Sequence, residues 1–179
     1  MRTNLLITIV LSIVAFSGCA RQIPNKVTAD EYAVYSAWAT GHFVKNPPQQ
    51  LYFSSRTGVF DPLADPWKSC LQKDGASESQ MKQLHVLGDA QYALDFYQSS
   101  NLQIPWSYKE VDRVPDLEPG TFRLITFSRV AFTRDHSGAL FAFFDACAAG
   151  ECGSGGYVQG QKQGGKWIFH NLSGCVELS

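Results

Sequence analysis

The sequence predicts an α+β fold, in which N-terminal helices pack on a C-terminal antiparallel β-meander. Two patterns carry this prediction. Apolar residues recur at helical spacing after residue 28, and they alternate as in β-strands from residue 121 onward. The composition is that of a folded chain, because 45% of the 179 residues are apolar and only 17% are charged. This length allows one or at most two compact domains.

The charge balance excludes one class of partner. The 15 Lys and Arg residues nearly match the 16 Asp and Glu residues, which gives a formal net charge of −1. Such a chain lacks the positive field with which proteins attract polyanions. We therefore expect no nucleic-acid partner.

Residues 1–18 have the pattern of an export signal. Arg2 lies in a short polar start, and residues 5–16 form an almost continuous apolar run. This run is too short for a membrane-spanning helix, which takes about 20 residues. Its length does match the apolar core of a signal peptide.

The segment Phe16-Ser17-Gly18-Cys19 ends this run. It resembles the lipobox of bacterial lipoproteins, in which a branched aliphatic residue and two small residues precede a cysteine. Phe16 departs from the usual leucine. The resemblance implies that Cys19 receives a diacylglyceryl group and becomes the first residue of the mature chain, with an acylated amine. The alternatives are a conventional signal peptide with an incidental cysteine, or a retained anchor.

This interpretation defines the domain organisation. Residues 1–18 are a lipoprotein signal peptide, residues 19–27 a lipidated tether and residues 28–179 a single α+β domain. Two or three acyl chains hold a protein stably at a membrane surface, so we expect a lipid-anchored location in the cell envelope. Ala20 follows the cysteine, where an inner-membrane lipoprotein of a Gram-negative bacterium often has aspartate. The resemblance thus implies the outer membrane, facing the periplasm, in a Gram-negative cell.

Assigning Cys19 to lipid leaves an even set of cysteines, which we expect to form two disulfides outside the cytosol: Cys70, Cys147, Cys152 and Cys175. Four cysteines allow three pairings, and the sequence does not select one. We favour Cys147–Cys152 together with Cys70–Cys175, because Gly150 permits a tight turn within the short loop. Loop-closure entropy assigns about 4.7 kcal/mol to the long loop and about 2 kcal/mol to the short one.

A second reading of the cysteines is a metal site. Cys147 and Cys152, followed by His170 and Cys175, have a spacing that loosely resembles a zinc ribbon. An oxidising compartment disfavours this reading, and we expect no metal and no cofactor.

The clearest helix begins at Thr28. Thr28 and Glu31 form a capping box, in which each side chain accepts a hydrogen bond from the other residue's backbone amide. Aromatic residues then follow at helical spacing until Pro47 ends the helix. Such a stripe is typical of a core face, and we expect His42, which shares it, to be a packed imidazole and not a base.

The middle of the chain alternates between weaker signals. The sequence predicts a strand over 51–55, a helix opened by a second capping box at Ser77 and Gln80, and a further helical face over 90–97. Three prolines and several charges predict a long crossing loop over 103–120.

The last third of the chain predicts about four antiparallel strands. A two-sided strand covers 124–133, a hairpin loop follows at 134–138, and a second strand covers 139–146. Another hairpin turns at 163–165. By analogy of element order alone, this arrangement also suits a cone-shaped NTF2-like or cystatin-like sheet.

A likeness extends over most of the mature chain and is strongest in this last third. Its segments are Glu31–Ser36, Ser128–Phe132, Cys147–Gly156 and Gly165–Trp167. They resemble a group of small bacterial exported proteins of unknown activity, which share an SRV-G-F strand, a cysteine–glycine loop and a G-K-W strand. Ala131 stands where that group usually has glycine. The resemblance implies an architecture and no activity.

No catalytic set is predicted. Ser154 lies in a Cys-Gly-Ser-Gly-Gly run, which lacks the aspartate of a chymotrypsin-like serine and the register of a G-x-S-x-G elbow. The carboxylates of 112–118 lack a calcium-loop register. Asp145 and His136 could meet in the fold, but the sequence does not show it.

The sequence thus favours a lipid-anchored cell-envelope protein that acts as a non-catalytic binding or structural module. Its expected partners are the membrane, through the anchor, and an envelope protein, a glycan or a small molecule. The alternative is a small hydrolase or isomerase with a pocket between helices and sheet.

Overall fold

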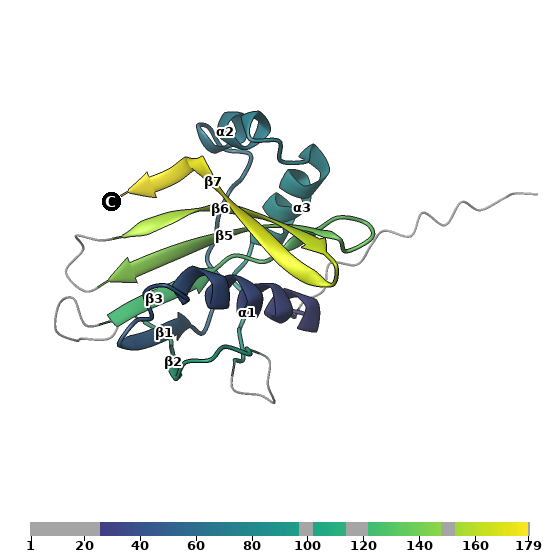
Figure 1. The fold of residues 1–179 in the computed structure, drawn as a ribbon. Helices are drawn as coiled ribbons and strands as arrows, with labels where there is room; N and C mark the ends of the chain where they lie inside the picture. The colour runs from purple at the N-terminus through teal and green to yellow at the C-terminus, as the bar shows by residue number, and fades with distance from the viewer. Residues whose placement is uncertain (1–25, 97–101, 114–121, 148–152, 179) are drawn as a thin grey trace, which may run out of the picture.

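The computed structural model describes residues 26–96, 102–113, 122–147 and 153–178 (Figure 1). Of Cys147 and residues 173–178 it describes the backbone alone. The expected signal peptide, Cys19 and most of the tether lie outside these ranges. The described residues form an α+β domain with three helices and a mixed sheet of seven strands. The elements are α1 (Ala29–Phe43), β1 (Gln50–Ser54), α2 (Trp67–Lys73), α3 (Glu78–Gly88), β2 (Tyr108–Val111), β3 (Phe122–Phe127), β4 (Ala131–Phe132), β5 (Gly138–Cys147), β6 (Ser154–Gln163) and β7 (Lys166–Leu178).

The sheet has the strand order β2-β1-β3-β5-β6-β7, with the short β4 paired to β5. Strands β3, β5, β6 and β7 are antiparallel neighbours, as the predicted meander requires. Strand β1 instead runs parallel to both β2 and β3. The sheet is therefore mixed, because an N-terminal strand and a strand from the middle of the chain extend the meander at one edge.

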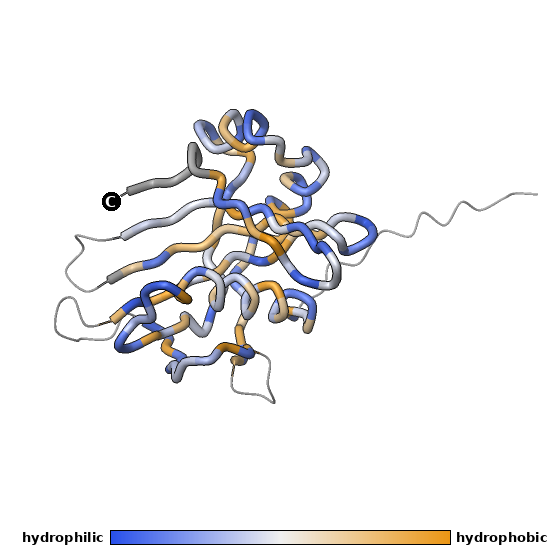
Figure 2. The backbone as a smooth tube through the Cα atoms, viewed as in Figure 1, coloured by the Kyte–Doolittle hydropathy of each residue, from blue (hydrophilic) through white to orange (hydrophobic). Residues whose placement is uncertain are grey.

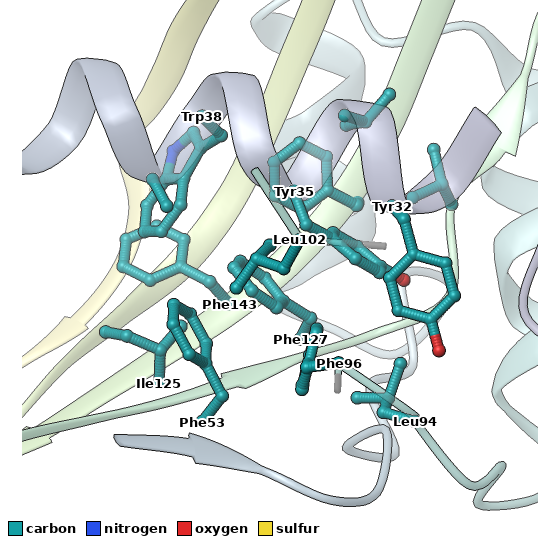
Figure 3. Packing of buried hydrophobic residues seen from close by; sticks show 14 of the residues in the cluster. Tyr32, Tyr35, Trp38, Phe53, Leu94, Phe96, Leu102, Ile125, Phe127 and Phe143 are labelled. Atoms are coloured by element: carbon teal, nitrogen blue, oxygen red, sulfur yellow. The ribbon is translucent and has the colours of Figure 1, made fainter. Parts of the chain in front are cut away.

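Helix α1 contributes a row of aromatic side chains to the main core (Figure 3). The ring of Tyr35 stacks on Phe127 of β3, with centroids 4.4 Å apart. Trp38 meets Phe127 and Phe141 edge to face. Aromatic pairs of this geometry contribute about 0.5–1.5 kcal/mol each beyond the area they bury, so α1 is held on the sheet by specific ring contacts.

A second buried cluster involves α2 and α3. Leu71 of α2 and Leu84 of α3 pack with Leu140 of β5 and Tyr157 of β6. The alternating side chains of β5 explain the two clusters, because Phe141 and its in-phase neighbours join the α1 cluster while Leu140 and Ala142 join this one. Figure 2 shows β5 as a largely apolar strand in the middle of the domain.

The capping box that opens α1 is confirmed. The Glu31 amide donates to Thr28 Oγ1 at 3.4 Å, and the Thr28 amide donates to Glu31 Oε2 at 2.8 Å. The predicted strand over 51–55 is also confirmed as β1, and both hairpins form. Gly164 and Gly165 make the second turn with φ values of 55° and 81°, which glycine adopts without strain.

The second capping box is wrong. Helix α3 does begin after Ser77, but the Ser77 side chain makes no capping bond and contacts Ser79 instead. Gln80 is buried and donates to the carbonyl oxygen of Ala131 at 3.2 Å. Gln80 bonds to Ala131 and not to the helix start, because the buried carbonyl of the two-residue strand β4 needs a donor.

The predicted helical face over 90–97 is also wrong within the described residues. Residues 90–96 contain no helix; Ala93 forms an isolated bridge with Arg56, and Leu94 donates to the carbonyl of Ser55 at 2.7 Å. Leu94 and Phe96 are buried in the α1 cluster. A short series of apolar residues fits both the helical and the strand period. Here, pairing with the chain after β1 decides the conformation.

The loop predicted over 103–120 contains strand β2, and helix α2 was not predicted. Strand β2 forms because Tyr108–Val111 pairs with β1 at the sheet edge, between Pro105 and Pro115. The strand predicted over 124–133 is interrupted at Ser128, whose hydroxyl accepts from the Ala142 amide at 2.8 Å in place of a backbone carbonyl. This interruption separates β3 from β4.

Candidate functional site

The structure describes only some of the cysteines predicted to carry lipid or form disulfides. Cys19 and Cys152 lie outside the described residues, as do the side chains of Cys147 at the end of β5 and Cys175 in β7. Cys70, in α2, is disulfide-bonded. Its pairing with Cys175 stays a prediction, and so does the Cys147–Cys152 bridge.

The zinc-ribbon alternative is not tested, because Cys152 and the side chains of Cys147 and Cys175 lie outside the described residues. His170 is an exposed residue of β7, opposite Gln159 of β6. Among the residues the structure describes, no group of three His, Cys, Asp or Glu side chains could hold a metal ion. Of the loop carboxylates, Asp112 accepts a hydrogen bond from Ser55, and the others lie outside the described ranges.

Histidines pair with aspartates in three places within the described part of the chain. His85 Nδ1 lies 2.9 Å from Asp61, and His136 Nδ1 lies 3.1 Å from Asp30. His136 therefore does not meet Asp145, which settles a question that the sequence left open. In both pairs the carboxylate is exposed to solvent, and such surface pairs contribute little to stability.

The third pair has a buried carboxylate. Asp145 of β5 is 0% exposed. Arg123 of β3 binds it through the side edge of its guanidinium: Nε donates to Oδ1 at 2.7 Å, and Nη2 donates to Oδ2. Strand register explains the contact, because Ile125 lies opposite Asp145 and Arg123 is two residues away on the same face. Removing a carboxylate from water costs several kcal/mol unless it is paired, so the guanidinium is what permits Asp145 to be buried.

His42 approaches the same carboxylate from the last turn of α1. Its Nε2 lies 3.4 Å from Asp145 Oδ2, the oxygen that Arg123 Nη2 also contacts. The imidazole stacks on Trp38, with centroids 4.4 Å apart and planes 17° apart, and meets Phe43 edge to face. His42 is thus a packed imidazole, as expected, but it also belongs to a polar cluster that the sequence analysis missed.

We call His42, Arg123 and Asp145 the carboxylate cluster. It is closed toward the core and open to solvent, since the side chain of His42 is 24% exposed and that of Arg123 38%. A signal for it existed in the sequence. Arg123 and Asp145 occupy the inward phase of strands whose other inward residues include Ile125, Phe127 and Phe143, and a charge in an apolar phase must find a partner.

The cluster has no nucleophile in contact with its histidine. Ser154 of β6 is the register partner of Asp145. However, no hydroxyl or thiol of the described residues is hydrogen-bonded to His42, whose recorded polar contact is Asp145. A nucleophile–base pair requires such a bond.

A second ion pair is sealed in the core. Arg129 Nε donates to Glu31 Oε1 at 2.7 Å, and both side chains are 2% exposed. Arg129 also donates to the carbonyl of Lys26, and its guanidinium lies 4.4 Å from the ring centroid of Tyr92. The Val130 amide donates to the same Glu31 oxygen at 3.0 Å. This closed network joins the start of α1 to the strand interruption and has a structural role.

No protein-family model matches the chain, and no curated protein or solved structure matches it significantly. In the described ranges no helix combines the length and the apolar character needed to cross a bilayer.

Proposed function

We propose that this protein is a lipoprotein of the cell envelope, anchored through acyl chains on Cys19, whose folded domain is a non-catalytic binding or structural module. The observation that carries the proposal is the Phe16-Ser17-Gly18-Cys19 segment directly after an apolar run of signal-peptide length. On this proposal the domain stands on a membrane surface and meets its partners outside the cytosol. In a Gram-negative cell the membrane is the outer one, and the domain faces the periplasm.

The disulfide at Cys70 supports this location. Disulfides persist in oxidising compartments and are rare in the cytosol, and Cys70 is disulfide-bonded. Helix α2, which carries Cys70, contacts β7, which carries Cys175. We propose that these two residues form the long bridge and that Cys147 and Cys152 form the short one.

For the architecture we propose the plan of NTF2-like or cystatin-like proteins, with N-terminal helices on an antiparallel meander. The ring contacts of α1 with β3 and β5 support this plan. The parallel strands β1 and β2 would be an addition to it. The likeness to small exported proteins with SRV, cysteine–glycine and G-K-W segments remains part of the proposal and adds no activity.

A binding module accounts for the carboxylate cluster better than an enzyme does. In the described chain His42 contacts a buried carboxylate without a nucleophile beside it. The polar network around Arg129 is closed to solvent. The expected ligands are an envelope protein, a glycan or a small molecule; a hydrolase or isomerase is the alternative.

The anchor is tested by labelling bacteria that express the full chain with radioactive palmitate. We expect label in the wild type and in a Cys152→Ala variant, and none in a Cys19→Ala variant, because the thiol of Cys19 is the predicted attachment atom. The Cys152→Ala variant controls for the loss of a cysteine. Label that survives Cys19→Ala, or a wild type without label, would contradict the proposal.

A further inference from the structure

The carboxylate cluster has donor capacity left after its internal contacts are counted. Arg123 uses Nε and Nη2 on Asp145. Its remaining nitrogen, Nη1, carries two N–H groups, and no described residue accepts a hydrogen bond from them. Because the two contacts to Asp145 hold the guanidinium plane, Nη1 has a fixed direction.

His42 is in a similar state. Its Nε2 faces Asp145 at 3.4 Å, and Trp38 stacks on one face of the ring. The other nitrogen, Nδ1, has no hydrogen-bond partner among the described residues. The stacking on Trp38 restricts the orientation of the ring, and the carboxylate beside Nε2 leaves Nδ1 for a ligand.

The two unused nitrogens belong to neighbouring side chains. Arg123 Nη2 and His42 Nε2 contact the same oxygen, Asp145 Oδ2. Both side chains are partly exposed, at 38% and 24%, whereas Asp145 is buried beneath them. The buried carboxylate thus holds two cationic or proton-bearing groups side by side at the surface.

We propose that His42 and Arg123 form a binding site for the oxyanion group of a ligand, a carboxylate or a phosphate. The free edge of a guanidinium matches such oxygens in charge and geometry. An imidazole nitrogen accepts from a protonated ligand oxygen or, when protonated, donates to an ionised one. A metal ion is disfavoured, because the guanidinium of Arg123 would repel it. The inference rests on the proposal that the domain is a binding module, and it names the chemical class of the ligand.

The chain contains its own controls for this site. It has 4 histidines, of which His85 and His136 also pair with aspartates. Their carboxylates are exposed, and no arginine of the described residues forms an ion pair with either carboxylate. A specific oxyanion site therefore affects His42 and leaves these two histidines unchanged, whereas general ion binding affects all of them alike.

The experiment is a side-chain NMR titration of the full-length purified protein with inorganic phosphate and, separately, with acetate, at constant ionic strength set by sodium chloride. We expect the imidazole signals of His42 to shift and saturate with at least one anion, while those of His85 and His136 do not. The anion that saturates identifies the source, phosphate or carboxylate. Shifts of His42 that fail to saturate, or that match those of the other histidines, overturn the proposal.

Two variants keep the test decisive if one of them unfolds. Arg123→Lys keeps the charge but loses the planar fork, and we expect it to weaken binding about tenfold. In His42→Gln the arginine Nε signal replaces the histidine as the reporter, and saturation should again weaken. Binding unchanged in a folded variant would overturn the proposal. Loss of the site would leave lipid attachment at Cys19 untouched, because the palmitate experiment does not depend on these residues.

Discussion

Arg129 carries a charge that would ordinarily place it at the surface, yet its side chain lies in the core. It is 2% exposed and forms its ion pair with a Glu31 that is equally buried. Replacing a buried pair by apolar residues is often harmless, whereas removing one partner leaves an uncompensated charge. Glu31 depends on Arg129 for this reason, and Glu31 also closes the capping box of α1.

We therefore expect Arg129→Met to lower the free energy of unfolding by about 3–5 kcal/mol, because the Glu31 carboxylate stays buried without its cation. Urea unfolding followed by circular dichroism measures this. The matched control is Lys82→Met, which removes the exposed partner of Glu78 and should change stability by no more than about 0.5 kcal/mol. Equal losses of unfolding free energy in the two variants would show that the buried Arg129–Glu31 pair contributes no more to stability than the exposed pair.

Tyr35 gives a pH prediction. Burial raises the pKa of its hydroxyl well above the usual 10.0, and the hydroxyl donates to the Ser128 carbonyl at 2.6 Å. A group whose pKa is raised on folding contributes stability below its unfolded pKa, and this stability is lost as the pH rises from there toward the folded value.

The free energy of unfolding should thus fall above pH 10, partly because unfolded Tyr35 ionises and the folded residue does not. In Tyr35→Phe this decline should be shallower by up to about 1.4 kcal/mol per pH unit. Denaturant unfolding between pH 9 and pH 11 checks the slope. Tyr52→Phe is the control, and an identical slope in wild type and Tyr35→Phe would contradict the assignment.

Elements with strong local signals were predictable from the sequence, and elements set by distant contacts were not. The capping box of Thr28 and the glycines of the second hairpin act within a few residues, so they were correctly identified. Strand β2 depends on pairing with β1, more than fifty residues earlier in the chain. Gln80 fits a local cap, but its partner is Ala131.

The carboxylate cluster was missed for the same physical reason. His42, Arg123 and Asp145 come from α1, β3 and β5, and they meet only because the register of β3 on β5 places two charges on the face that α1 covers. Alternation along each strand marks Arg123 and Asp145 as inward residues. It does not give the register that joins them.

At the scale of the elements, we expect alanine substitutions at two glycines to change stability in opposite directions. Gly165 has φ 81° in the β6–β7 turn, so Gly165→Ala should cost about 1 kcal/mol or more, because a side chain disfavours that conformation. Gly41 lies in α1 with open space around it, so Gly41→Ala should gain up to about 1 kcal/mol from helix propensity. Thermal unfolding of both variants checks the signs, and a stabilising Gly165→Ala would contradict the turn geometry.

At the scale of the whole molecule, the proposed lipid anchor and the proposed disulfide would join the membrane surface to the folded sheet. The backbone carbonyl of Lys26, in the proposed tether, is held by Arg129, which ties the start of the domain to the break between β3 and β4. The proposed Cys70–Cys175 bridge would fix α2 to β7 at the far side of the sheet. On this proposal the domain keeps the carboxylate cluster in a constant setting, and the lipid would hold the chain at the membrane.

The most direct test of the central claim, an oxidised domain held by lipid at Cys19, is the intact mass of the native protein purified from bacterial membranes without reductant. The account predicts a chain that begins at Cys19, carries a diacylglyceryl group and an amine-linked acyl chain, and lacks the four hydrogens lost in two disulfides. A mass equal to that of all 179 residues with no added lipid would contradict it.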